Sequence, residues 1–165
     1  MKQVSIDFHA SVTVSASLKR QILVAAKKTL NAIPKRLFRI KTRHAKTLSL
    51  SVVVLGPVAM KRLNFTYRKK NKPTDVLSFS RMEGQQIPTI HQEIGEVILC
   101  LSVAKKAAKD SQISLSEEVQ RLTIHGVLHL FGYDHETNQR DAKRMFALQE
   151  SILAKLCRVS RRNVA

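Results

Sequence analysis

The chain has 165 residues, of which 29 are Lys or Arg and only 12 are Asp or Glu, so its formal net charge is +17. A domain of this length buries about 70% of the surface that its unfolded chain exposes, which is enough for a real core. The charge indicates a polyanionic partner, nucleic acid before membrane, and no carboxylate occurs between Asp7 and Asp75. A general compositional bias toward lysine is the alternative explanation.

The sequence shows no sign of export or of a membrane span. Its N-terminus lacks the apolar core of a signal peptide, and no apolar run approaches about 18 residues. The two cysteines, Cys100 and Cys157, lack the spacing of metal ligands and fit a reducing compartment. We therefore expect a cytoplasmic protein that does not contact a membrane.

Hydrophobic periodicity predicts the elements in chain order. Ser17 is the expected cap of the first helix, and Pro34 ends it. Residues 34–46 form a basic connector, which is either a solvated loop or an arm that contacts phosphates. The predicted elements of this half are a strand at 4–8, a helix at 18–33, a strand at 48–55 and a helix at 57–68.

The second half continues with strands and then with helices only. We predict a strand at 75–79, a loop at 81–92, a central strand at 96–101, and helices at 103–109 after Ser102, from Ser114 to Gly132, and from Thr137 onward. Residues 158–165 are expected to be a basic, disordered tail. The order predicts one α+β domain over 1–157, with a small mixed sheet of about four strands flanked by helices. The helix before Gly132 is apolar around most of its circumference, so we expect it to be buried at the centre.

Three histidines at the end of that helix form the most informative motif. His125 and His129 are four residues apart and therefore project from one helix face. Gly132 can adopt the left-handed conformation that ends a helix, which turns His135 back toward the same point. Three imidazoles with an open fourth position describe a catalytic zinc site, whose bound water has a pKa of about 7 in the best-studied example. A chance pair on a helix with a loop histidine is the alternative.

The spacing matches H-E-x-x-H-x-x-G-x-x-H, the long zinc motif of metzincin peptidases, with Gly126 in place of Glu. That Glu is the general base of the peptidases. Peptide hydrolysis by the usual route is therefore disfavoured, and another divalent transition metal could occupy three histidines as readily as zinc.

The eleven residues from His125 to His135, read as HGVLHLFGYDH, resemble the signature of the YbeY family of bacterial metal-dependent endoribonucleases. Two further blocks fit the resemblance, LNFTYR at 63–68 and TDVLSF at 74–79. One departure is Gly95-Glu96, where members usually carry Gly-Asp. The resemblance implies an α+β fold, a metal ion, and a role in ribosomal RNA processing and in ribosome maturation or quality control. The implied partner is RNA, either ribosomal RNA or the small ribosomal subunit.

The resemblance also places Arg68 among the functional residues, where a guanidinium can bind two phosphate oxygens. Without it, Arg68 would be interpreted as a residue that satisfies carbonyls at a helix end. Lys69, Lys70 and Lys72 follow and could bind the flanking RNA backbone, or form an ordinary exposed basic loop. Asp134 could orient a ligand histidine, or be a turn residue.

Two functional hypotheses fit these features. The first is a zinc-dependent endoribonuclease that acts on single-stranded RNA, with either metal-bound hydroxide or the substrate's 2′-hydroxyl as the nucleophile. The second is a metal-stabilised RNA-binding factor for ribosome assembly with negligible turnover, which the absence of the general base keeps open. The sequence does not predict the oligomeric state.

Overall fold

The computed structural model describes residues 3–37, 45–82, 90–135 and 138–162, with side chains as far as Leu156 in the last range. Four strands form one sheet in the order β1-β2-β4-β3. The strands are β1 (Gln3–Ala10), β2 (Thr47–Leu55), β3 (Val76–Ser80) and β4 (His91–Cys100). β2 pairs in parallel with both β1 and β4, whereas β3 is antiparallel to β4. The predicted α+β fold with a small mixed sheet is confirmed.

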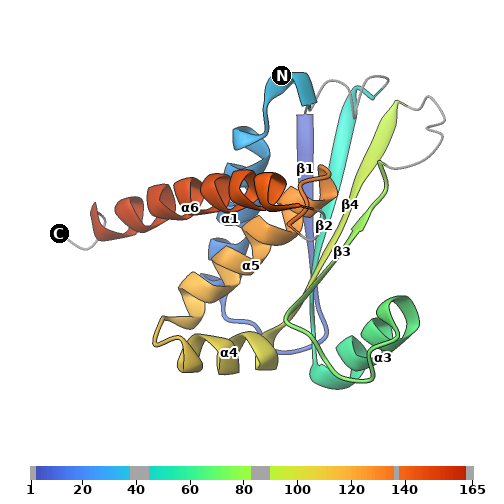
Figure 1. Cartoon of the computed structure of the whole chain (residues 1–165), viewed down its shortest axis with the longest axis vertical. Coiled ribbons are helices and arrows are strands. Elements are labelled where there is room, and N and C mark those ends of the chain that lie inside the picture. Colours follow the sequence, from blue (N-terminus) through green and yellow to red (C-terminus); the bar gives the residue numbers. More distant parts are fainter. Residues whose placement is uncertain (1–2, 38–44, 83–89, 136–137, 163–165) are drawn as a thin grey trace.

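The helices are α1 (Ala16–Ala32), α3 (Pro57–Arg68), α4 (Leu101–Asp110), α5 (Leu115–Leu130) and α6 (Gln139–Arg162). α1, α5 and α6 gather on one side of the sheet, away from α3 (Figure 1). α3 packs against the opposite face, where its Met60 joins a small cluster with Leu77 of β3 and Ile98 of β4. None of the helices in the described residues is long and apolar enough to cross a membrane.

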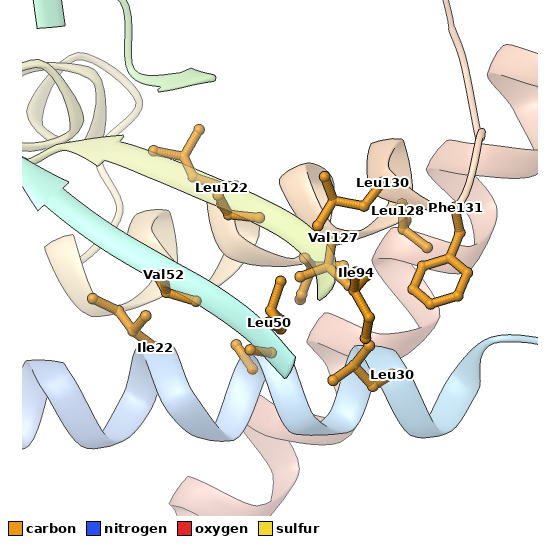
Figure 2. Packing of buried hydrophobic residues seen from close by; sticks show 14 of the residues in the cluster. Ile22, Leu30, Leu50, Val52, Ile94, Leu122, Val127, Leu128, Leu130 and Phe131 are labelled. Carbon is orange, nitrogen blue, oxygen red and sulfur yellow. The ribbon is translucent and has the colours of Figure 1, made fainter. Parts of the chain in front are cut away.

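The main core fills the space between the sheet and the helices on the first side. Leu50 and Val52 of β2 and Ile94 of β4 meet Ile22 of α1 and Val127 of α5 there (Figure 2). These side chains are fully buried. Strand residues alternate between faces, so every second residue of the central strands contributes to this core.

α5 is the helix around which the other elements pack. It contacts β3, β4, α1, α4 and α6, and ten of its 16 residues are buried. Ser114 caps it by accepting a hydrogen bond from the Glu117 amide at 3.1 Å. The predicted capping residue and the predicted central burial of this helix are therefore confirmed. Its C-terminal end delivers the histidines into the cavity described below.

Several boundaries differ from the prediction. Ser15, not Ser17, caps α1, and α4 begins at Leu101 after Cys100 instead of after Ser102. β4 begins at His91, inside the segment predicted as a loop. Its early start follows from pairing with β2, which continues from Thr47 opposite His91 despite a bulge near Ser49. The strand includes polar residues there because its backbone pairs with β2, although the sequence lacks the apolar pattern of a strand.

The C-terminal helix also differs from expectation. Asn138 caps α6 by accepting a hydrogen bond from the Asp141 amide at 2.9 Å, while the predicted cap, Thr137, lies outside the described residues. α6 continues to Arg162, into the segment expected to be a disordered tail. Neither Gly nor Pro occurs between Leu156 and Arg162 to end the helix. The domain boundary at Cys157 stays a prediction. Most of the basic connector, 38–44, lies outside the described residues.

Candidate metal centre and substrate cavity

The three predicted histidines converge in the structure. One nitrogen from each of His125, His129 and His135 lies within 4.8 Å of the other two. The Nε2 atoms of His125 and His129 are 3.0 Å apart. Two nitrogens bound tetrahedrally to one zinc ion at 2.0–2.1 Å would be about 3.3 Å apart, so small side-chain adjustments suffice for both to bind one ion. The three residues fit a divalent metal, and these neutral donors would leave its charge uncompensated.

The end of α5 explains how His135 reaches the other two. Gly132 has a φ of 83°, in the left-handed region. Its amide donates to the carbonyl of His129 at 2.9 Å, and the Tyr133 amide donates to the carbonyl of Leu128 at 3.2 Å. This pair of bonds is a Schellman motif, which reverses the chain after the helix. The predicted left-handed turn at Gly132 is therefore confirmed.

Two side chains of α6 hold the histidines in place. The Oε1 atom of Gln149 is 3.0 Å from Nδ1 of His125, and the Gln149 Nε2 group donates to Glu150 at 3.3 Å. The amide is therefore oriented to accept a hydrogen bond from His125 Nδ1–H, which leaves Nε2 of that ring as the metal-binding atom. Phe146 stacks on the His135 ring, with the centroids 5.5 Å apart.

The environment keeps His125 in the form that binds metals. Burial, together with the neighbouring His129, lowers the pKa of His125 from its ordinary 6.5 to about 4, although the hydrogen bond with Gln149 acts in the opposite direction. At neutral pH the ring is therefore uncharged and carries a single N–H. A metal ion does not have to displace a proton from this ligand.

The histidines line a polar cavity of about 680 Å³ between α3, β3 and α5. Arg68, at the last turn of α3, lines the same cavity. Residues far apart in the sequence are thus brought around one space, as an anionic substrate held by metal and arginine would require. Asp75 and Ser78 also line it.

Gly126 occupies a tight contact between α5 and the sheet. A Cβ atom at this position would lie 2.6 Å from Cγ1 of Val97 and 3.0 Å from Oγ of Ser78. A side chain at the position of the peptidase Glu would thus point into the sheet. Gly126 stands where the peptidase motif has its general base. A glycine fits this position because α5 packs closely against β4.

The other predicted site residues are not among those that line the cavity. Lys69, Lys70 and Lys72 are exposed in the turn after α3 and do not line the cavity. Lys69 has a left-handed backbone, and its Nζ atom donates to the Thr66 carbonyl at 3.1 Å. Asp134 is half-buried beside His135. Roles in RNA binding and in histidine orientation stay predictions for these four residues.

The sequence alone did not reveal four contributors to the site. Gln149 and Phe146 come from α6, and nothing in their spacing links them to the histidines. Arg121 lies four residues before His125, a spacing that could have placed it on the same face of α5. Asp75 was predicted as the first residue of a strand and as part of a family block, without a role in the site.

Comparison with known proteins shows the family of this chain. The sequence model of the family described as Endoribonuclease YbeY matches residues 14–157. The chain belongs to this family. An Endoribonuclease YbeY from Sulfurihydrogenibium sp. is 43% identical over 113 residues, which cover 68% of this chain and 73% of that protein. One from Thermodesulfovibrio yellowstonii is 35% identical, covering 84% and 92%.

A solved structure shares the fold of this chain. A solution structure of a protein from Thermotoga maritima superimposes with a TM-score of 0.62 and 22% sequence identity, covering 96% of this chain and 93% of that one. The predicted family is confirmed. Because the YbeY family is described as endoribonucleases, the prediction of a hydrolase of the nuclease class is confirmed at the level of the family. The three-histidine group could hold a metal ion.

Proposed function

We propose that this YbeY protein is a zinc-dependent endoribonuclease that cleaves single-stranded RNA in the cytoplasm, with ribosomal RNA precursors or the small ribosomal subunit as its substrate. One observation carries the proposal: three imidazole nitrogens within 4.8 Å of one another share a polar cavity with Arg68. A phosphodiester is a substrate class that a divalent cation and a guanidinium can bind together, since both interact with phosphate oxygens.

In this reaction the residues of the site have separate roles. His125, His129 and His135 would hold the ion, which supplies Lewis acidity toward a phosphate oxygen and lowers the pKa of bound water. Arg68 binds the scissile phosphate through paired N–H donors and stabilises the negative charge that grows on its oxygens. Gln149 keeps the His125 ring in the tautomer that presents Nε2 to the ion.

Flanking RNA is bound outside the cavity. Lys69, Lys70 and Lys72 are exposed in the turn that directly follows Arg68, so a strand with one phosphate at Arg68 can run past them. Such contacts are electrostatic and independent of sequence. They fit the net charge of +17. Asp134 supports His135 from the neighbouring position.

The test is cleavage of a labelled single-stranded fragment of ribosomal RNA by zinc-loaded protein. The wild type is compared with His129→Ala and Arg68→Ala, all purified from one host. His9→Ala, on β1, and Arg62→Ala, an exposed arginine of α3 that does not line the cavity, are the matched controls. We expect the two cavity variants to lose at least 100-fold in rate, since an interaction with transition-state charge is worth about 3 kcal/mol, and the two controls to match the wild type.

The products identify the nucleophile. A 2′,3′-cyclic phosphate end would mean that the substrate's own 2′-hydroxyl attacks, whereas a 5′-phosphate or 3′-phosphate end formed without a cyclic intermediate would mean that water does. Equal cleavage by all five proteins would mean that the nuclease is a contaminant. That outcome would overturn the proposal.

The metal requirement is tested separately. Dialysis against a strong chelator should abolish cleavage, and stoichiometric Zn²⁺ should restore it. Three histidines also suit Ni²⁺ and other transition metals, so the protein purified from its own cytoplasm should be analysed for metal content. Full activity after chelation would exclude the metal from the reaction.

A second candidate function is favoured by the packing at Gly126, which leaves no peptidase-type carboxylate on α5 next to His125. In that case the protein is a metal-stabilised RNA-binding factor for ribosome assembly. It would bind the same RNA fragment tightly, and binding but not cleavage would respond to the cavity variants.

A further inference from the structure

The cavity contains a second arginine that the proposed reaction does not use. Arg121, His125 and His129 follow one another at intervals of four residues on α5, and all three line the cavity. A four-residue step on a helix rises about 6 Å, so Arg121 lies roughly one turn from His125. Arg121 and Arg68 approach the same space from different elements, α5 and α3.

Arg121 is fixed in place by a buried carboxylate. Its Nε atom donates to Oε2 of Glu118 at 2.9 Å, and its Nη2 atom donates to Oε1 at 2.6 Å. Glu118 is completely buried, whereas the Arg121 side chain is 37% exposed. A guanidinium has five N–H donors, and this fork uses two. Within the described residues the other three have no protein acceptor, so they are available to a ligand in the cavity.

The arrangement is more than a surface ion pair. Burial of a carboxylate is costly, and replacing a buried ion pair by apolar residues is often neutral or stabilising. Apolar residues in place of both Glu118 and Arg121 would therefore be expected to stabilise the fold about as well as the ion pair does. Its specific effect is to hold a planar cation rigidly at the edge of the cavity. Rigid, forked guanidinium groups are typical of phosphate recognition.

We propose that Arg121 binds a second phosphate of the RNA, adjacent to the one that is cleaved, and that Glu118 is its positioning residue. This inference rests on the proposed function. It gives the cavity two phosphate sites along the strand, one next to Arg68 and the histidines and one a helical turn away. A site with two phosphates favours an oligonucleotide over a single nucleotide or a free phosphate.

The test is binding of a fluorescein-labelled single-stranded RNA to chelator-treated protein, measured by anisotropy over a series of KCl concentrations. Metal-free conditions keep the RNA intact. Arg121→Gln should weaken binding about tenfold or more and reduce the slope of log affinity against log salt by about 0.7, as expected for one lost phosphate contact to a single strand. Arg20→Gln, an exposed arginine of α1 outside the cavity, should change neither value to this extent.

The design must separate RNA binding from folding, because Arg121→Gln leaves Glu118 buried without a partner. The double variant Glu118→Gln with Arg121→Gln removes both charges and allows the two amides to pair. We expect it to recover the melting temperature of the wild type while keeping the weak binding and the reduced slope. Arg121→Lys retains the ion pair and the charge but loses the fork, so it should fold, bind several-fold more weakly and keep the wild-type slope.

Each outcome decides one point. Recovery of RNA affinity together with stability in the double variant would overturn the inference, because Arg121 would then be purely structural. If Arg121→Gln and the double variant both fail to fold, Arg121→Lys decides the question. Wild-type affinity and slope in that variant would also overturn the inference. If the wild type does not cleave RNA, the proposed reaction is wrong, but the binding test of Arg121 remains valid. Cleavage combined with an unchanged slope in Arg121→Gln would overturn the role of Arg121 alone.

Discussion

The Oε1 atom of Gln149 lies 3.0 Å from Nδ1 of His125, although the two residues are 24 positions apart. Hydrogen bonds to the far nitrogen of a ligand histidine fix its tautomer and raise its basicity, and their loss usually lowers metal affinity 10–100-fold. We expect that drop in zinc affinity for Gln149→Leu, which keeps the buried volume. Competition with a chromophoric chelator measures it.

Gln149→Glu is the matched control for this prediction. It retains an acceptor of the same shape opposite His125 but loses the hydrogen bond that Gln149 donates to Glu150, so zinc affinity should stay above that of Gln149→Leu. If Gln149→Leu binds zinc as tightly as the wild type, the hydrogen bond does not orient the ligand.

Gly126→Ala tests the close contact between α5 and β4. Alanine would normally stabilise a helix interior by about 0.5–1 kcal/mol. Here its Cβ would lie 2.6 Å from Cγ1 of Val97, which is fully buried in a central strand and has little room to move. Overpacking of this kind costs about 1–3 kcal/mol, so the net effect should be a loss of stability. Urea unfolding of the metal-free protein measures the free energy of unfolding.

Gly56→Ala provides the comparison, because a Cβ at that position would be 3.4 Å from the nearest side-chain atom. Gly56 caps α3 with an extended backbone that alanine can adopt, so the cost should be below about 1 kcal/mol. A stabilised Gly126→Ala protein would show that α5 can move away from the sheet.

Local chemistry made much of this structure predictable. The Ser114 cap, the left-handed turn at Gly132 and the spacing of His125 and His129 each depend on residues close together in the sequence. The structure shows the cap, the turn and the two histidines on one helix. The apolar run that became β4 indicated a central strand in the same way. Such features depend on hydrogen bonds and periodicity that do not need the rest of the chain.

Long-range contacts account for what could not be predicted. The start of β4 at His91 depends on pairing with Thr47, and Gln149 reaches His125 only because α6 packs against α5. From the sequence alone, Gly126 is interpreted as the absence of the peptidase general base. In the structure the position has no room for a side chain, because Val97 lies against it. The pairing of Arg121 with Glu118 was visible as a helical i, i+3 spacing, but its burial was not.

Gly132→Ala tests the turn that returns His135 to the cluster. A φ of 83° puts a residue with a Cβ in the left-handed region, at a cost of roughly 1–2 kcal/mol. The chain can relieve that strain by opening the Schellman bonds, which would displace His135, so both stability and zinc affinity should fall. Calorimetry and the chelator competition measure the two effects. Gly132→Asn should be milder in both, since Asn tolerates this conformation, and identical losses for Ala and Asn would exclude backbone strain as the cause.

The low pKa of His125 predicts acid sensitivity of the metal-free protein. Its pKa is about 4 when folded and 6.5 in the ordinary, solvated state, so the unfolded chain binds the proton more tightly. Stability should therefore fall as the pH drops from 6.5 toward 4, with no contribution from this residue above about 7. One pKa unit corresponds to about 1.4 kcal/mol, which solvent screening of the partly exposed ring reduces. Since 1 kcal/mol shifts the melting temperature of such a domain by about 2–4 °C, several degrees should separate the wild type from His125→Gln.

The measurement is the melting temperature from pH 7.5 to 4 for the wild type, His125→Gln and His9→Gln, an exposed histidine of β1. Protonation of carboxylates is common to all three proteins, so only the differences between the curves carry information. The wild type and His9→Gln should fall together below pH 6.5, and His125→Gln should fall less steeply. Parallel curves for all three would mean that burial of the His125 ring does not disfavour its proton, and the site would then lose its preorganised neutral ligand.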